Sequence, residues 1–252
     1  MTKVSSALLL SVSWAAYAQI PDSFSPGTVG SINSLAVQSD GSVLVGGSFR
    51  RPGDQYPINI GRLNPEGALD TSFPASANGN VKTVVIQSDG YILVGGFFDV
   101  LGGQGRNCLG RLTSQGNVDS TFNPGANSDV NSLAMQTDGK ILVGGSFTTL
   151  GGQSHFFLGR LSPNGTVDAS FNPAAGSTVH SLAIQPDGKI LVGGSFPWLD
   201  GQSRSNIGRL NPDGSLDPDF NPGANGKVTA LAVLPDGKIL VGGGFSMLGG
   251  QD

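Results

Sequence analysis

Four arginines of this sequence are each followed, eight residues later, by an aspartate, and these charged pairs are the most regular residues that could do chemistry. Each pair could lie across one hairpin turn, as an ion pair or as a bond from the aspartate to the backbone. A ring of equivalent arginines around an axis could instead bind a ligand, but like charges in such a ring would repel one another. We therefore expect a structural role within each hairpin. The pairs are Arg62 with Asp70, Arg111 with Asp119, Arg160 with Asp168, and Arg209 with Asp217.

Other reactive side chains are few and do not form a known motif. His155 and His180 are the only histidines and Cys108 is the only cysteine, so neither a zinc site nor an intrachain disulfide is expected. The sequence has no Gly-x-Ser-x-Gly elbow, no phosphate-binding glycine loop and no Asp-x-Asp-x-Asp-Gly calcium loop. We predict no cofactor and no metal site, and we interpret Cys108 as an incidental side chain.

The elements that must position these residues are predicted to be β-strands. The chain has 252 residues, of which 40 are glycine and 15 proline, and only 13% are charged. Short runs of Val, Ile, Leu and Phe bounded by Gly, Pro, Asn and Asp recur throughout, which is typical of strands and turns. Long helices are therefore not expected, and the sequence predicts an all-β protein.

The first 18 residues have the pattern of a cleaved signal peptide. Lys3 precedes an apolar run over residues 7–16, and Ala16-Tyr17-Ala18 supplies the small residues that a signal peptidase accepts. The run is too short to span a bilayer, and no later segment has the roughly 20 apolar residues that a membrane helix needs. We predict a Sec-type signal peptide at residues 1–18, cleavage after Ala18, a mature domain over residues 19–252, and a secreted, extracellular or periplasmic bacterial protein.

The charge of the mature chain argues against nucleic acid as a partner. Removal of Lys3 leaves 13 of the 14 lysines and arginines against 18 aspartates and glutamates, which gives a net charge of 13 − 18 = −5. A negative domain is not attracted to phosphate backbones or to anionic lipid. We expect neither nucleic acid nor a membrane surface to be a partner.

Self-similarity at a fixed spacing sets the organisation of the chain. Asp-Gly followed by an apolar triplet and Gly-Gly-x-Phe recurs every 49 residues, and Gly-Arg-Leu recurs with the same period from Gly61 onward. The Asp-Gly motifs begin at Asp40, Asp89, Asp138, Asp187 and Asp236.

Each copy of the repeat is predicted to hold four antiparallel strands. In the third copy these are residues 130–136, 141–147, 158–161 and 167–171. Asp138-Gly139 and the corresponding Pro-Asp-Gly sequences fit tight hairpin turns in which glycine takes the left-handed position. The strand that starts at Ile141 is apolar without alternation, so both faces of its sheet must be covered.

A four-stranded sheet of about 50 residues with both faces buried is typical of a β-propeller blade. A parallel β-helix would need about half that period, and an open β array or tandem sandwiches are the alternatives. The sequence holds four complete copies, and Phe24 and the segment after Asp236 supply parts of a fifth. The two parts could close a five-bladed ring, or the chain could be a fragment of a longer array.

The repeat resembles a known family. The order Asp-Gly-Lys-Ile-Leu-Val-Gly-Gly-x-Phe, Leu-Gly-Gly-Gln, Gly-Arg-Leu and Val-Asp-x-x-Phe-Asn-Pro is similar to the delta-60 repeats of bacterial secreted proteins, over nearly all of residues 20–252. The resemblance implies a β-propeller and an exported bacterial protein of unknown function, and it supplies no catalytic residues.

Residues that differ from copy to copy concentrate in the loop between the second and third strands. In a propeller this loop and the loop between blades open on the same face, and a varied loop face on a uniform scaffold is how binding surfaces are built; drift without selection would give the same variation. The candidate binding face consists of Arg50, Arg51, Tyr56, Arg106, His155, Phe156, Trp198 and Arg204.

Two functions follow from these residues. The first is a secreted, non-enzymatic scaffold that binds a protein or a polysaccharide through the loop face. The alternative is an extracellular hydrolase or lyase that acts on polysaccharide, with Asp54, Asp99 or Asp200 as acid or base and His155 assisting. Paired-carboxylate hydrolysis needs two such groups within about 5 to 10 Å of each other, so their separation distinguishes the two functions.

Overall fold

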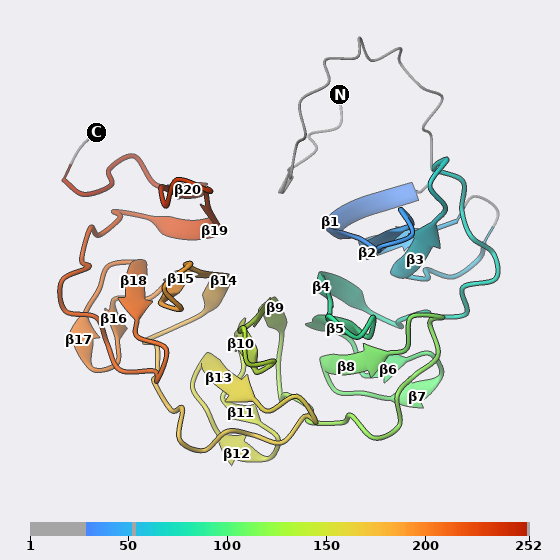
Figure 1. Ribbon diagram of the computed structural model, residues 1–252, viewed down its shortest axis with the longest axis horizontal. Coiled ribbons are helices and arrows are strands. Elements are labelled where there is room, and N and C mark those ends of the chain that lie inside the picture. Colours follow the sequence, from blue (N-terminus) through green and yellow to red (C-terminus); the bar gives the residue numbers. More distant parts are fainter. Residues whose placement is uncertain (1–28, 52–53, 251–252) are drawn as a thin grey trace, which may run out of the picture.

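The computed structural model describes residues 29–51 and 54–250, and every regular element in these residues is a β-strand (Figure 1). Within that part of the chain no helix is long and apolar enough to cross a membrane. The predicted signal peptide at residues 1–18 and the strand expected around Phe24 lie outside the described residues.

Five antiparallel sheets, which we call blades 1 to 5, follow one another along an arc (Figure 1). The first strand of each blade lies toward the middle of the arc and the third lies farther out. Blades 1 to 4 have three strands each, and blade 5 has two. The strands are β1 (Val29–Val37), β2 (Val43–Arg50) and β3 (Ile60–Leu63) in blade 1; β4 (Asn80–Ile86), β5 (Ile92–Phe97) and β8 (Leu109–Leu112) in blade 2; β9 (Val130–Met135), β10 (Ile141–Gly145) and β13 (Leu158–Leu161) in blade 3; β14 (Val179–Ile184), β15 (Ile190–Gly194) and β18 (Ile207–Leu210) in blade 4; and β19 (Lys227–Val233) and β20 (Ile239–Gly244) in blade 5.

In blades 2 to 4 a short two-stranded hairpin connects the second strand with the third. These hairpins lie at the outer rim of the arc (Figure 1). They are β6 (Val100–Leu101) with β7 (Gln104–Gly105), β11 (Thr149–Leu150) with β12 (Gln153–Ser154), and β16 (Trp198–Leu199) with β17 (Gln202–Ser203).

The fourth strand of the expected blade is reduced to a single bridge. In blade 3, Val167 pairs with Leu161 and no further pairs follow. The next residue, Asp168, accepts a hydrogen bond from the backbone N–H of Ser170 on its own Oδ1 at 3.1 Å, which turns the chain out of the extended conformation. The four-stranded blade is therefore not confirmed, and each complete blade has three strands with one further bridge.

Both faces of the middle blades are buried, as the apolar second strand predicts. Ile141 and Val143 pack in a cluster with Leu93 of blade 2, whereas Leu142 packs on the other side with Val179 of blade 4. All three side chains of β10 are inaccessible to solvent. The blades thus shield one another's apolar faces along the arc.

The arc does not close into a ring in the described residues. Blades 1 and 5 stand at its two ends, and their strands share no sheet (Figure 1). Closure as five blades, which the sequence left open, is not observed. The all-β fold and the propeller-like order of the sheets are as expected.

Candidate functional site

The loops between blades lie beside the rim hairpins. The two kinds of variable loop therefore share the outer edge of the arc, where the sequence predicted one shared face (Figure 1). Each inter-blade loop forms a bridge to the hairpin of the following blade or, in blade 5, to the segment at the same place in the repeat. We call this edge the loop edge. The bridges join Ala77 to Leu101, Ala126 to Leu150, Ala175 to Leu199 and Ala224 to Leu248.

Three residues of the predicted binding face are buried under the hairpins. Arg106, His155 and Arg204 are only 2 to 7% exposed. Arg106 donates to the backbone oxygen of Asp119 at 3.0 Å, and Arg204 donates to that of Asp217 at 3.4 Å. These three side chains fill the inside of their blades and are not available as an exposed contact surface.

The other predicted residues are more accessible but are divided among blades. Tyr56 belongs to blade 1, Phe156 to blade 3 and Trp198 to blade 4, with 72, 50 and 38% of their surface exposed. Arg50 is exposed and Arg51 is half-buried, both in blade 1. Of the predicted residues, Arg51 and Tyr56 come together around a pocket.

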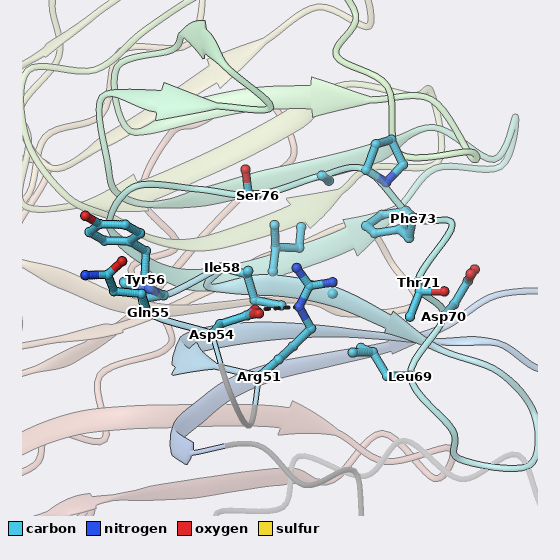
Figure 2. A pocket seen from close by; sticks show the side chains of 15 residues that line it. Arg51, Asp54, Gln55, Tyr56, Ile58, Leu69, Asp70, Thr71, Phe73 and Ser76 are labelled. Atoms are coloured by element: carbon cyan, nitrogen blue, oxygen red, sulfur yellow. Dashed lines mark hydrogen bonds and ion pairs between the residues drawn. The ribbon is translucent and has the colours of Figure 1, made fainter.

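This pocket, of about 460 Å³, lies in blade 1 (Figure 2). Such a volume falls in the usual range for small-ligand sites. Arg51, Asp54 and Tyr56 line one part of it, and Asp70 and Phe73 line another. In Figure 2 the labelled Tyr56 and Phe73 stand on opposite sides, with the Arg51 side chain between them.

Beside the pocket, blade 1 has a proline where blades 2 to 4 have the larger side chains of Arg106, His155 and Arg204. In blade 2 the Cγ of Arg106 packs over Gly110, where a Cβ would lie 3.3 Å from it. The first copy has Pro57 at the place of Arg106, and a Cβ at Gly61 would meet no atom closer than 3.7 Å. The sequence shows this difference, and the structure shows that Pro57 and Gly61 line the hollow.

Two ion pairs give the pocket its electrostatic character. Arg51 Nε lies 2.6 Å from Asp54 Oδ2, and Arg62 Nη2 lies 2.6 Å from Asp70 Oδ2. Hydrogen bonds from the Ser72 hydroxyl and from Arg62 hold the pKa of Asp70 below its usual value. The guanidinium of Arg62 also lies over the Phe73 ring at 4.8 Å, which orders the aromatic wall. The expected pairing of arginine and aspartate eight residues apart is thus observed here.

The carboxylates of the alternative, enzymatic hypothesis do not form one site. Asp54 pairs with Arg51, Asp99 is bonded to Asn78 of the preceding inter-blade loop, and Asp200 belongs to blade 4. In residues 29–51 and 54–250, no three His, Cys, Asp or Glu side chains gather closely enough to hold a metal ion. His155 is buried, and this burial lowers its pKa.

A second polar cluster, which the sequence analysis missed, follows the inner strands. Lys82 Nζ lies 2.9 Å from Asn131 Oδ1 and 3.1 Å from Asp129 Oδ2 of the next blade. His180 Nε2 lies 2.9 Å from the Ser195 hydroxyl, and burial lowers the pKa of His180, as do Lys227 and Lys82. In the sequence, this cluster is marked by a polar residue that varies from copy to copy at one position in the first strand of each blade. These residues are Asn33, Lys82, Asn131, His180 and Thr229.

Solved structures share this fold at low sequence identity. A structure of streptogramin B lyase matches with a TM-score of 0.56 and 19% identity, over 89% of this chain and 63% of that one. The extracellular domain of a putative hybrid two component system from B. thetaiotaomicron matches with a TM-score of 0.55 and 14% identity, over 84% of this chain and 25% of that one. The WD40 β-propeller domain of Doa1 matches with a TM-score of 0.53 and 16% identity, over 83% of this chain and 75% of that one. The chain spans less than two thirds of the lyase, and likeness at such identities shows the fold alone.

No curated protein matches the sequence. A family match covers the repeats themselves, at residues 38–73, 87–122, 136–171, 185–220 and 234–252. These segments make up more than half of the chain and contain the hairpin turns and the Gly-Arg-Leu strands on which the blades are built. The chain therefore belongs to the family described as "Domain of unknown function (DUF5122) beta-propeller".

Proposed function

We propose that this protein is a secreted, non-enzymatic scaffold that binds a polysaccharide or a protein at its loop edge, with the blade 1 pocket as the principal contact. One observation carries the proposal: the hollow occurs in the copy whose residues at the rim depart most from the others. A uniform repeat that is altered at one place is expected where a ligand binds.

The lining of the pocket favours a polar ligand with a flat face. Arg51 and Tyr56 offer hydrogen-bond donors, Asp70 offers an acceptor, and Phe73 offers an aromatic wall. A sugar ring, with hydroxyls at its edge and C–H groups on its face, has matching chemistry. A peptide side chain that is polar and planar would fit the same groups. Export from the cell accords with the predicted signal peptide and with the resemblance to delta-60 repeats.

The test is a glycan array and a protein array probed with the mature chain, followed by calorimetry on the strongest hit. We expect Arg51→Ala and Tyr56→Ala each to weaken binding at least tenfold. Arg50→Ala and Phe156→Ala are the matched controls, because these residues are exposed and do not line the pocket. Equal loss in all four variants, or no loss in the first two, would count against the pocket.

The enzymatic alternative has less support, because Asp54, Asp99 and Asp200 belong to different blades. The likeness to streptogramin B lyase concerns the fold and supplies no residue to this chain. Incubation of each array hit with the protein, followed by mass spectrometry, separates the two functions. Unchanged ligand supports the scaffold, whereas turnover that Asp200→Asn abolishes would replace it with the hydrolase or lyase.

A further inference from the structure

The first strand of every blade carries a β-bulge at the same place. In blade 4, Val179 pairs with Gly194 and Ser181 with Gly193, so His180 has no partner of its own in the ladder. A bulge changes the direction in which a side chain leaves its strand. We call the residues at this place the bulge residues; they are Asn33, Lys82, Asn131, His180 and Thr229.

The bulge residues reach the next blade on the inner side of the arc, where the first strands lie (Figure 1). Asn33 Nδ2 donates to Oδ1 of Asn80 in blade 2 at 2.7 Å. Lys82 Nζ lies 3.1 Å from Oδ2 of Asp129, which has the same place in the repeat as Asn80. Each bulge side chain is therefore matched with the residue at the start of the next inner strand.

These matches are complementary near the N-terminus but not between blades 4 and 5. An amide meets an amide between blades 1 and 2, and an ammonium group meets a carboxylate between blades 2 and 3. Between blades 4 and 5, the two places hold His180 of β14 and Lys227 of β19, strands that pack on each other. Among the residues that the structure describes, no carboxylate lies within ion-pair distance of either side chain.

The groups around His180 add further positive charge and a hydroxyl. Its Nε2 lies 2.9 Å from the hydroxyl of Ser195 in the same blade. Burial lowers the pKa of His180, and the charges of Lys227 and Lys82 lower it further. Asp129 is paired with Lys82 and offsets one of these two charges. The surroundings of His180 therefore keep one net positive charge, which becomes two when the imidazole is protonated.

Lys227 is also held in place along its stem. Its side chain lies over Gly244 of the neighbouring strand, where an added Cβ would lie 3.3 Å from Lys227 Cε. The other blades carry Ser48, Phe97, Ser146 and Ser195 at the place of Gly244. The ammonium group is therefore supported by its own blade rather than by a partner of opposite charge.

We propose that the inner side of blades 4 and 5 is a binding site for a carboxylate group, which lies between His180 and Lys227. When His180 Nε2 donates to the Ser195 oxygen, the hydroxyl hydrogen and the Nδ1–H of a protonated imidazole remain for the ligand. A net charge of one favours a monoanion over a dianion such as phosphate. This site shares no residue with the blade 1 pocket, so neither proposal depends on the other.

Carboxylate binding and protonation of His180 should strengthen each other. Negative charge beside the ring favours the imidazolium form, so the bound ligand should raise the pKa of His180. By linkage, the ligand should bind more tightly as the pH falls through this pKa. A rise of about one pKa unit corresponds to about tenfold tighter binding to the protonated form.

The experiment is a proton NMR titration of the two histidines, with and without sodium glucuronate at constant ionic strength. His180→Gln assigns the two ring signals. We expect glucuronate to raise the pKa of His180 by about one unit. His155 is buried in blade 3 and serves as the internal reference, so its signal should not respond. The methyl ester of glucuronate, which has no charge, should leave both signals unchanged.

Two lysine variants distinguish a site from general charge attraction. Lys227→Gln should weaken glucuronate binding about tenfold, because one of the two cationic groups beside the ligand is lost. Lys238→Gln changes the net charge equally but lies in a hairpin turn, where Lys238 pairs with Asp236. This control should bind glucuronate like the unmodified protein. The His155 signal verifies that each variant is folded.

Four results would overturn the proposal. These are a pKa of His180 that glucuronate does not change, equal shifts of both histidines, equal loss of binding in the two lysine variants, and binding of the methyl ester as strong as that of glucuronate. Tighter binding of inorganic phosphate than of glucuronate would contradict the preference for a monoanion. None of these results bears on Arg51 and Tyr56, so the blade 1 pocket is tested separately.

Discussion

At the scale of single residues, the repeat shows that Cys108 occupies a position with a left-handed backbone conformation. The four residues at this place, Asn59, Cys108, Phe157 and Asn206, all adopt left-handed backbone angles, with φ between 57° and 68°. Asparagine tolerates this conformation better than other side chains with a Cβ. Where it is present, its amide also bonds the next inter-blade loop: Asn206 Nδ2 donates to the oxygen of Ala224 at 2.9 Å.

Cys108→Asn should therefore stabilise the protein. The new amide would relieve the backbone and reach the oxygen of Ala126, the counterpart of Ala224. We expect a gain of about 1 kcal/mol, the net value of one hydrogen bond, measured as the shift in a urea unfolding transition under reducing conditions. Asn206→Ala is the control in the opposite direction and should lower the free energy of unfolding by a similar amount. A lower stability of Cys108→Asn would show that the packing of the thiol matters more than the backbone.

At the scale of the strand, the two consecutive glycines in the second strand of each blade are required for different reasons. In blade 3, Gly144 receives Val179 of the next blade, with a Cβ-to-Cγ1 distance of 2.6 Å if a Cβ were added. Gly145 stands against its own blade, where an added Cβ would lie 2.0 Å from the backbone oxygen of Asp129. The first glycine is thus a requirement of packing between blades, and the second a requirement of the bulge within one.

The same substitution at one repeat position should have opposite consequences in two blades. Gly144→Ala forces Cβ into Val179 and should destabilise the protein by about 1 to 3 kcal/mol, the usual cost of overpacking. Gly242→Ala meets only Ala230 at an ordinary contact distance and should be nearly neutral. Thermal unfolding of both variants at low protein concentration tests this. Equal losses would mean that the neighbouring blade does not set the cost of the added methyl group.

The sequence could predict the elements that depend on local chemistry or on burial of whole strands. The hairpin at Asp138-Gly139 forms as expected, with Gly139 at a φ of 81° and Asp138 accepting from the N–H of Lys140. The buried run from Ile141 also follows from its composition. The burial of Arg106 could not be predicted from the sequence. Variation between copies does not distinguish an exposed guanidinium from a buried one whose hydrogen bonds go to carbonyl oxygens. The blade 1 pocket was missed because no motif in the sequence marks a hollow.

At the scale of the whole molecule, the blades form a one-dimensional stack. Each blade touches only its neighbours along the arc, so a middle blade is supported on two sides and an end blade on one. In such a stack the stability is close to a sum of the blades and of the contacts between neighbours. The end blades should therefore open without the middle ones, even though all five share nearly the same sequence.

Hydrogen exchange should reveal this gradient. The backbone amides of β10 lie in a strand buried on both faces, whereas β20 is half-covered and β1 exposes Leu35 and Val37. We expect exchange in β1 and β20 to be at least tenfold faster than in β10, a difference in opening free energy of about 1.4 kcal/mol or more. Mass spectrometry of peptic peptides, at a concentration where the protein is monomeric, measures it. Protection that is uniform along the chain would mean that the arc unfolds as one cooperative unit.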